Sequence, residues 1–310
     1  MSLPKIVIAG GTGFLGQLLA SSLIDRGKDV ILLSRKDPQK KLHGRVVFWN
    51  AKSLGDWVEE MEGAETLINL TGRSIDCRHN QSNRREILDS RIQSTRVLGE
   101  AILGCETPPV VWLNASSMAL YGEYLYGGLA HDENAPIQRS GFLEEVTVAW
   151  EEEFFKFTRA DVRQIAMRIS FVLGRSSGAF PLLKKLTHFG LGGKQASGKQ
   201  WMSWLHEDDW VGIVDFLINH PLISGPVNVT SPDPVQNSRF MKTMRSQFAP
   251  LGIGFPGPKL AVLLGCWLLG SAPELALQSR HVLPGVLQKK GYKFRKASLD
   301  EAIAALAKSS

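Results

Sequence analysis

Residues 5–16, with the sequence KIVIAGGTGFLG, decide the fold of this chain. An apolar, β-branched run opens the stretch, a cluster of glycines interrupts it, and leucines at helical spacing continue through residues 17–27. This order predicts a buried strand, a tight turn and a helix. Such a unit is the usual start of an α/β fold.

Three glycines at a spacing of three form a GxxGxxG motif in this turn. The first permits the turn, the second lets backbone approach a pyrophosphate, and the third lets the helix pack against the sheet. Free N–H groups at the helix start suit the same anion. The motif predicts a dinucleotide site made by Gly10, Thr12, Gly13, Phe14, Leu15 and Gly16, and a merely structural turn is the alternative.

Further apolar runs alternate with segments compatible with helices. The expected strands are residues 29–35, 44–50, 65–72, 109–117 and 162–174, and the expected helices are residues 54–62, 84–103 and 142–157. Continuous apolar runs of this kind are typical of strands that are buried on both faces of a parallel sheet. We therefore expect a Rossmann-type, doubly wound parallel α/β sheet with a smaller, mostly helical C-terminal domain.

The pattern changes after Gly174. Residues 190–198 are rich in glycine, residues 206–220 indicate a helix with an acidic start, and from Val235 helices alternate with Pro/Gly-rich connections. We expect a dinucleotide-binding domain over 1–231, a substrate-cleft insertion at about 176–205, and a C-terminal domain over 232–310. The apolar stretch 260–270 is shorter than the roughly 20 residues of a membrane span, so we expect a buried helix there. A membrane-surface or signal role is the alternative.

Composition narrows the class of protein. Of 310 residues, 44% are hydrophobic and 21% are charged, which is typical of a globular domain. The net charge of +6 is not concentrated in basic runs, so we expect a small phosphate-bearing ligand, no nucleic acid and no membrane. Three scattered cysteines and no close pair of histidines predict no disulfide framework and no metal site. A reducing, cytoplasmic location follows, since no signal peptide is recognisable.

The end of the second expected strand indicates which cofactor is used. Enzymes that bind NAD place an acidic residue there, about 20 residues after the glycines, to hold a ribose hydroxyl. This chain has Ser34, Arg35 and Lys36. A guanidinium can pair with a 2′-phosphate in bidentate fashion, so we expect NADP(H). A solvated Arg-Lys pair is the alternative.

Several motifs together resemble the extended short-chain dehydrogenase/reductases. They are the glycine turn, NLTG at 69–72, SSMALYG at 116–122 and RISFVLG at 168–174. DSRIQST at 89–95, VAWE at 148–151, GKQWMSWLHEDD at 198–209 and SRHVLP at 279–284 narrow the resemblance to an epimerase-family branch. That branch is described as sugar-nucleotide-epimerase-like and has a small C-terminal domain. The resemblance covers essentially the whole chain.

The resemblance implies roles for further residues. Asn69, Leu70, Thr71 and Gly72 correspond to positions that contact the cofactor's ribose or phosphate, and Asn50 lies near the adenine. Ser117 matches the serine that polarises the substrate, with Ser116 beside it at the cofactor. Relatives often form homodimers through the helices after strands four and five, although the sequence shows no exposed apolar stripe there.

One departure from the family concerns catalysis. Relatives carry YxxxK on the helix after strand five, where the tyrosine exchanges a proton with the substrate. Here Leu143 and Thr147 are the counterparts, and Tyr292 with Lys296 forms the chain's YxxxK match. We interpret that match as a chance occurrence on a short strand of the C-terminal domain.

Other residues could replace the missing acid or base. Tyr121 is the preferred candidate, and the weaker alternatives are Tyr124, Tyr126, Asp132 and Glu133. If Asp132 and Glu133 do not transfer a proton, they are solvated residues of a loop. Arg91 could point a cation at the cleft or form a surface ion pair.

The segment after residue 198 is the candidate for substrate contact. Trp201, Trp204 and His206 could supply stacking surface and polar orientation. The alternative for the two tryptophans is packing between domains, and the alternative for His206 is a position at the start of a helix.

Two functions of different class follow. The first is an NADP(H)-dependent oxidoreductase or epimerase-like enzyme that acts on a small or nucleotide-linked substrate. The second is a non-enzymatic NADP(H) sensor or scaffold, which the missing YxxxK favours.

Overall fold

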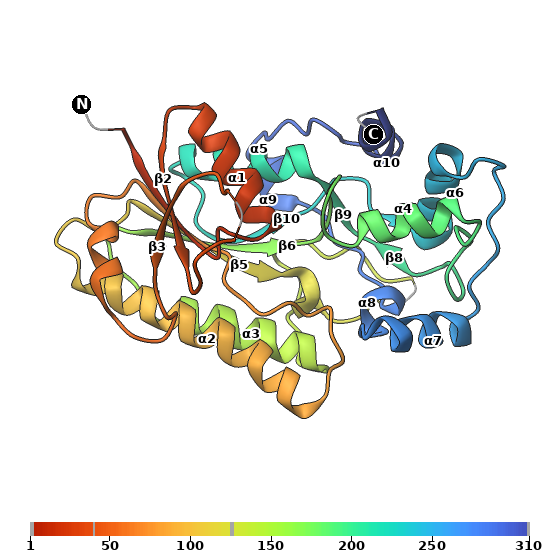
Figure 1. Ribbon diagram of the computed structural model, residues 1–310, viewed down its shortest axis with the longest axis horizontal. Coiled ribbons are helices and arrows are strands. Elements are labelled where there is room, and N and C mark those ends of the chain that lie inside the picture. Colours follow the sequence, from red (N-terminus) through yellow and green to blue (C-terminus); the bar gives the residue numbers. More distant parts are fainter. Residues whose placement is uncertain (1–2, 40, 125–126, 309–310) are drawn as a thin grey trace.

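The computed structural model describes residues 3–39, 41–124 and 127–308. Its centre is one parallel sheet of seven strands (Figure 1). In spatial order these are β10 (Gly225–Val229), β6 (Arg163–Ile169), β5 (Val111–Ser117), β4 (Thr66–Asn69), β1 (Lys5–Ala9), β2 (Asp29–Ser34) and β3 (Arg45–Phe48). The order confirms the doubly wound sheet, because the chain moves outward from β1 first in one direction and then in the other.

Helices cover both faces of the sheet. On one face lie α1 (Phe14–Asp25), α5 (Glu207–Asn219) and α9 (Gly285–Lys289), and on the other lie α2 (Gln81–Gly104), α3 (Phe142–Phe154) and the 3-10 helix η1 (Asp56–Met61). Within β1, Ile6 and Ile8 pack into the first layer, whereas Val7 and Ala9 pack into the second. This alternation explains why a strand covered on both sides has an uninterrupted apolar sequence.

A second core lies beyond the carboxyl edge of the sheet. It joins β7 (Phe171–Leu173), α4 (Phe180–His188) and β9 (Trp204–His206) to α6 (Asn237–Phe248) and α10 (Leu299–Lys308). Two short strands, β8 (Trp201–Met202) and β11 (Val235–Gln236), pair beside it. Residues of the expected insertion and of the expected C-terminal domain thus share one core. The boundary at residue 231 stays a prediction.

Three expectations for local structure need correction. Residues 54–62 contain the 3-10 helix η1 in place of an α-helix, and residues 292–296 are irregular, not a strand. The apolar stretch 260–270 does form a helix, α7 (Lys259–Leu269), but the expectation that it is buried is wrong, because none of its residues is buried. It lies at the outer edge of the molecule beside α8 (Glu274–Leu277) (Figure 1). Among the described residues, no helix is both long and apolar enough to cross a bilayer.

Candidate functional site

The glycine turn lies where the strand order reverses, between β1 and β4. Gly10 has a φ of 75°, and a Cβ there would lie 2.8 Å from the backbone carbon of Leu70. A Cβ on Gly16 would lie 2.5 Å from the Cα of Gly11. Both positions therefore require glycine, the first for its conformation and the second for close packing of the helix against the turn.

Gly13 is different, because a Cβ there would meet only the carbonyl oxygen of Gly10, at 3.6 Å. It is the N-cap of α1 and is exposed, and no side chain caps the helix. The free N–H groups at this helix start form a cradle for an anion. Thr12, half-buried beside Gly13, belongs to the same turn.

Phe14 and Leu15 have packing roles. The Phe14 ring lies against Gly174 so closely that a Cβ there would clash with it. The Leu15 carbonyl accepts a hydrogen bond from the indole of Trp210, at 3.1 Å, which ties α1 to α5. Both side chains pack against the sheet core, so their contact with a cofactor stays a prediction.

A hollow of about 580 Å³ lies at the carboxyl edge of the sheet, between the turns after β2, β3 and β4 and the first half of α2. Four residues predicted from the sequence line it: Arg35, Asn50, Thr71 and Gly72. Its other walls are residues 51–52, 73–74 and the first half of α2. Arg35 is exposed and makes no side-chain hydrogen bond or ion pair to a described residue. A cation without a partner on the wall of a polar hollow is suited to an anionic ligand.

Ser34 and Asn50 hold the loops at the edge of this hollow. The Ser34 hydroxyl donates to the carbonyl of Lys36 at 2.7 Å. Asn50 Oδ1 accepts from the backbone N–H groups of Lys52 and Ser53, at 2.8 and 2.9 Å. Both side chains therefore shape the turns on which the predicted ligand contacts depend.

Asn69 has a similar role deeper in the protein. Its amide nitrogen donates to Asn114 at 2.7 Å and to Thr95 at 3.1 Å, and its oxygen accepts from the N–H of Thr71. It thereby fixes the carboxyl ends of β4 and β5 relative to α2. The N–H of Leu70 donates to Ala9, which joins this turn to β1. The buried Thr71 hydroxyl has no partner among the described residues.

A buried polar network lies under the end of β5. The Ser116 hydroxyl donates to Glu151 at 2.5 Å, and Arg168 binds both oxygens of that carboxylate, at 2.9 and 2.8 Å. Burial disfavours the charge of Arg168, but Glu151 outweighs it and the pKa of Arg168 is raised. This pair was not predicted from the sequence. Arg168 carried a signal, as a single charge inside the apolar run 165–173, whereas Glu151 opens a run of three glutamates and carried none.

Tyr121, the predicted acid or base, is part of this network. It lies in the 3-10 helix η2 (Met118–Tyr121) and is fully buried. Its hydroxyl donates to Asn228 and accepts from Arg168, both at 2.8 Å. Burial raises its pKa to about 12, so the hydroxyl keeps its proton at neutral pH. Catalysis by Tyr121 stays a prediction, and it requires the network to open.

Ser117 is placed differently from its neighbour. It is half-buried at the last position of β5, and its Oγ accepts the backbone N–H of Ala119 at 3.1 Å. The hydroxyl proton is left to donate elsewhere. On the facing helix α3, Leu143 and Thr147 are buried, and the Thr147 hydroxyl donates to the carbonyl of Leu143. Neither residue can exchange a proton at neutral pH.

The other candidate acids and bases have structural partners. Tyr124 donates its hydroxyl to the carbonyl of Gly128, and Tyr126 lies outside the described residues. Asp132 caps a turn at Asn134. Glu133 accepts the N–H groups of Asn228 and Val286, and burial raises its pKa. It is therefore not a solvated loop residue.

Of the two expectations for Arg91, the surface ion pair is wrong among the described residues. A cation directed at the cleft stays a prediction, since the guanidinium lies against Gly72 on the wall of the hollow. Its guanidinium donates to backbone carbonyls of Arg73 and Ile87, lies over the Trp150 ring, and makes no ion pair with a described residue. Burial lowers its pKa to about 10.

The tyrosine of the YxxxK match at Tyr292 and Lys296 has a structural partner. The Tyr292 hydroxyl donates to Asp209 on α5, and burial raises its pKa.

The three expected substrate contacts separate in the structure. Trp204 is fully buried in the second core and donates its indole N–H to Asp233. His206 is fully buried as the N-cap of α5, where its Nδ1 accepts the N–H of Asp208 at 3.0 Å. Trp201 is half-buried and stacks on His281 with 3.9 Å between ring centroids. Of the three, Trp201 has surface to offer a substrate.

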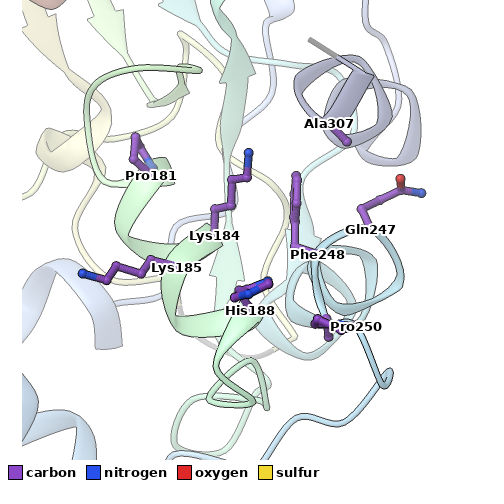
Figure 2. Close-up of a pocket in the computed structure, with 9 residues that line it drawn as sticks. Pro181, Lys184, Lys185, His188, Gln247, Phe248, Pro250 and Ala307 are labelled. Atoms are coloured by element: carbon purple, nitrogen blue, oxygen red, sulfur yellow. The ribbon is translucent and has the colours of Figure 1, made fainter. Parts of the chain in front are cut away.

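A second hollow of about 550 Å³ lies between α4, α6 and α10 (Figure 2). Figure 2 shows Lys184 extended beside the Phe248 ring, which lies 5.2 Å from its ammonium group. Lys185 and His188 lie in the last turn of α4, where the helix dipole is negative and favours cations. The end of the helix thus accounts for the placement of these two basic residues.

The donor set at the carboxyl edge fits a dinucleotide. The Gly13 cradle in the turn after β1 suits a pyrophosphate. The Thr71 hydroxyl, which has no partner among the described residues, lies in the turn after β4, and Arg35 lines the hollow from the turn after β2. These features lie on three adjacent strands, β1, β4 and β2. Crevices at such switch points are where open α/β sheets bind ligands.

Comparison with known proteins agrees with this geometry. The model of the NAD dependent epimerase/dehydratase family matches residues 6–229, and a domain of unknown function, DUF1731, matches residues 258–306. An epimerase family protein of Staphylococcus saprophyticus is 32% identical over 298 residues, which cover 96% of this chain and 97% of the relative. The epimerase family protein YfhF of Bacillus subtilis is 30% identical over 304 residues, 97% of each chain.

Solved structures extend the comparison. The crystal structure of the human epimerase family protein SDR39U1 with NADPH has a TM-score of 0.86 at 26% identity, covering 99% of this chain and all of the human one. The UDP-N-acetylglucosamine 4-epimerase of Bacillus cereus has a TM-score of 0.75 at 16% identity, covering 99% and 96%, and shares the fold. The resemblance seen in the sequence is confirmed: the chain belongs to the NAD dependent epimerase/dehydratase family.

Proposed function

We propose that this protein binds NADP(H) and acts as an oxidoreductase or epimerase-like enzyme on a small or nucleotide-linked substrate. The observation that carries the proposal is Arg35, an exposed guanidinium without a described partner on the wall of the dinucleotide hollow. A 2′-phosphate offers it two oxygens at once. The human relative solved with NADPH supports the same choice.

The residues of this chain would divide the work by position. The α1 start at Gly13 would bind the pyrophosphate, Arg35 the 2′-phosphate, and Asn69 would hold the two strand ends in register. When bound, the cofactor supplies or accepts a hydride. Ser117 would donate its hydroxyl proton in a hydrogen bond to a substrate carbonyl or alkoxide oxygen.

Non-enzymatic NADP(H) sensing is the second candidate. It is favoured because the usual positions carry no side chain that exchanges a proton at neutral pH. Leu143 and Thr147 replace the usual tyrosine and lysine, and Tyr121 has a pKa near 12 and a fully engaged hydroxyl. A dinucleotide could then bind without turnover.

A titration of the cofactor-stripped protein with NADPH and NADH tests the cofactor. Arg35→Glu should weaken NADPH binding by about tenfold to a hundredfold, because a charge-assisted contact is replaced by repulsion. NADH binding should change little. Lys36→Glu is the matched control, since Lys36 is an exposed cation that does not line the hollow. Equal losses for the two cofactors would contradict the assignment.

Turnover separates the two functions. A panel of carbonyl compounds and nucleotide sugars is screened through absorbance of the reduced nicotinamide. For any substrate turned over, Ser117→Ala should lower kcat while leaving NADPH affinity unchanged. Tight NADPH binding with no turnover across the panel would favour the sensor.

A further inference from the structure

The exposed apolar surface of this protein is concentrated in one segment. Of the 21 large hydrophobic side chains that are exposed among the described residues, nine lie between residues 251 and 275. On α7, Leu260, Leu264, Trp267 and Leu268 are 80%, 57%, 60% and 68% exposed. Their spacing of four, three and one places them on one face of the helix, which we call the α7 face. Large contiguous patches of exposed apolar side chains on soluble proteins mark interaction sites.

The helix is built to persist in this position. Pro258 precedes it, and Gly270 ends it in the left-handed conformation at a φ of 70°. Contacts also hold it to the loop after β4. Arg78 donates to the Trp267 carbonyl at 3.0 Å, and Ser271 donates to Asp76 at 2.5 Å. The α7 face is therefore a fixed surface and not the side of a frayed segment.

Gly265 in the middle of α7 has no role within the described chain. A Cβ there would meet nothing within 4 Å, and an interior glycine costs a helix about 1 kcal/mol relative to alanine. Ala261 lies one turn earlier and is exposed. Small residues next to Leu260 and Leu264 leave room for another backbone to approach the helix closely.

We infer that the α7 face is the contact between two copies of this chain. Together with the five other exposed apolar side chains of residues 251–275, the α7 face presents roughly 1,000 Å² of apolar surface, against about 800 Å² per partner in a standard stable interface. A second copy supplies the same apolar stripe and the same gap at Gly265, so the surface is self-complementary. The two α7 helices pack antiparallel across a twofold axis.

Charge favours this arrangement. Lys259 is the one charged residue of α7, and antiparallel packing puts the two lysines at opposite ends. Each ammonium then lies near the negative C-terminus of the partner helix. By contrast, the exposed residues of α2 and α3, the helices through which relatives often dimerise, include one large hydrophobic side chain, Leu103, and are mostly charged.

The test is the mass of the full-length chain in solution, measured by light scattering and sedimentation from nanomolar to tens of micromolar. The wild-type protein should have twice the monomer mass in the micromolar range. Leu264→Glu should be monomeric, with an unchanged far-UV spectrum and a cooperative urea transition whose midpoint, unlike that of the wild type, does not depend on protein concentration. Leu222→Glu is the matched control, a 76% exposed leucine outside the patch, and should stay dimeric. If Leu264→Glu does not fold, Leu268→Glu replaces it.

A mixing experiment tests the geometry. Leu264 is the midpoint of α7, so it faces its own counterpart across the twofold axis. Leu264→Glu and Leu264→Lys should each be monomeric alone and should form a heterodimer when mixed. A wild-type monomer at tens of micromolar, or a dimer that survives Leu264→Glu, would overturn the inference. So would a wild-type monomer that floats with phosphatidylcholine/phosphatidylglycerol vesicles, since the face would then bind lipid.

Discussion

Loss of one partner from the buried Glu151–Arg168 pair should be among the most destabilising single changes in the protein. Glu151→Leu leaves a guanidinium that is 3% exposed without its counter-charge. It also removes the acceptor of the Ser116 hydroxyl. Breaking a buried pair in this way costs about 3–5 kcal/mol of unfolding free energy.

The double variant separates charge from packing. In Glu151→Leu/Arg168→Met no charge is buried, so at least about 2 kcal/mol of the loss should be recovered. Glu152→Leu is the matched control, since Glu152 is the next residue of α3 and is exposed, with its partner Arg139. That change should cost less than about 1 kcal/mol.

Equilibrium urea unfolding, followed by tryptophan fluorescence, measures all three variants. The urea midpoint should be highest for Glu152→Leu, lower for the double variant and lowest for Glu151→Leu. The dependence of the unfolding free energy on urea concentration should be similar in all three. The reasoning is refuted if Glu151→Leu costs less than about 1 kcal/mol, or if the double variant is less stable than the single one.

Three further outcomes are expected. Gly13→Val should abolish NADPH binding in a titration yet leave the urea midpoint nearly unchanged, whereas Gly16→Val should prevent folding because its Cβ has no space; retained binding would contradict the pyrophosphate assignment. Glu60→Gln breaks a bidentate pair with Arg45 that lowers the pKa of Glu60. It should cost about 0.5 kcal/mol at neutral pH, and the difference from wild type should vanish as the pH falls below the ordinary value of 4.5; a constant difference would exclude the carboxylate as its cause. Burial lowers the pKa of His206, so the wild type should lose unfolding free energy as the pH falls below 6.5. His206→Asn should keep the cap of α5 and should show a weaker dependence on pH when unfolding is measured at several pH values.

The sequence alone was sufficient to predict the fold and the glycine turn after β1, whereas the binding of a dinucleotide at that turn stays a prediction. The glycine turn is a local device, because the φ of Gly10 and the close packing of Gly16 depend on neighbours within the turn and the adjacent strands. The continuous apolar runs likewise predict a two-sided parallel sheet. The place of Arg35 beside the glycine turn could be predicted from its position after the second strand, because the end of β2 lies next to the turn after β1 in this fold. Its contact with a 2′-phosphate stays a prediction.

Side-chain roles in the rest of the site depend on contacts between residues far apart in the chain. Tyr121 was a candidate acid or base from its loop position, and the structure surrounds its hydroxyl with Arg168 and Asn228. Trp204 and His206 were expected at a substrate, and they are buried by α6 and α5. A pattern shows which residues are polar or aromatic, but not which distant side chain satisfies each of them.

The same limit applies to α7. Its apolar sequence predicts burial, because burying leucine and tryptophan is favourable wherever a partner surface exists. The sequence therefore predicted a doubly wound parallel sheet, a glycine turn after its first strand and the helical character of α7, all of which follow from local periodicity and backbone conformation. Tertiary structure alone decided which polar groups are satisfied inside the protein, and that the α7 face stays exposed, because both depend on how distant segments pack.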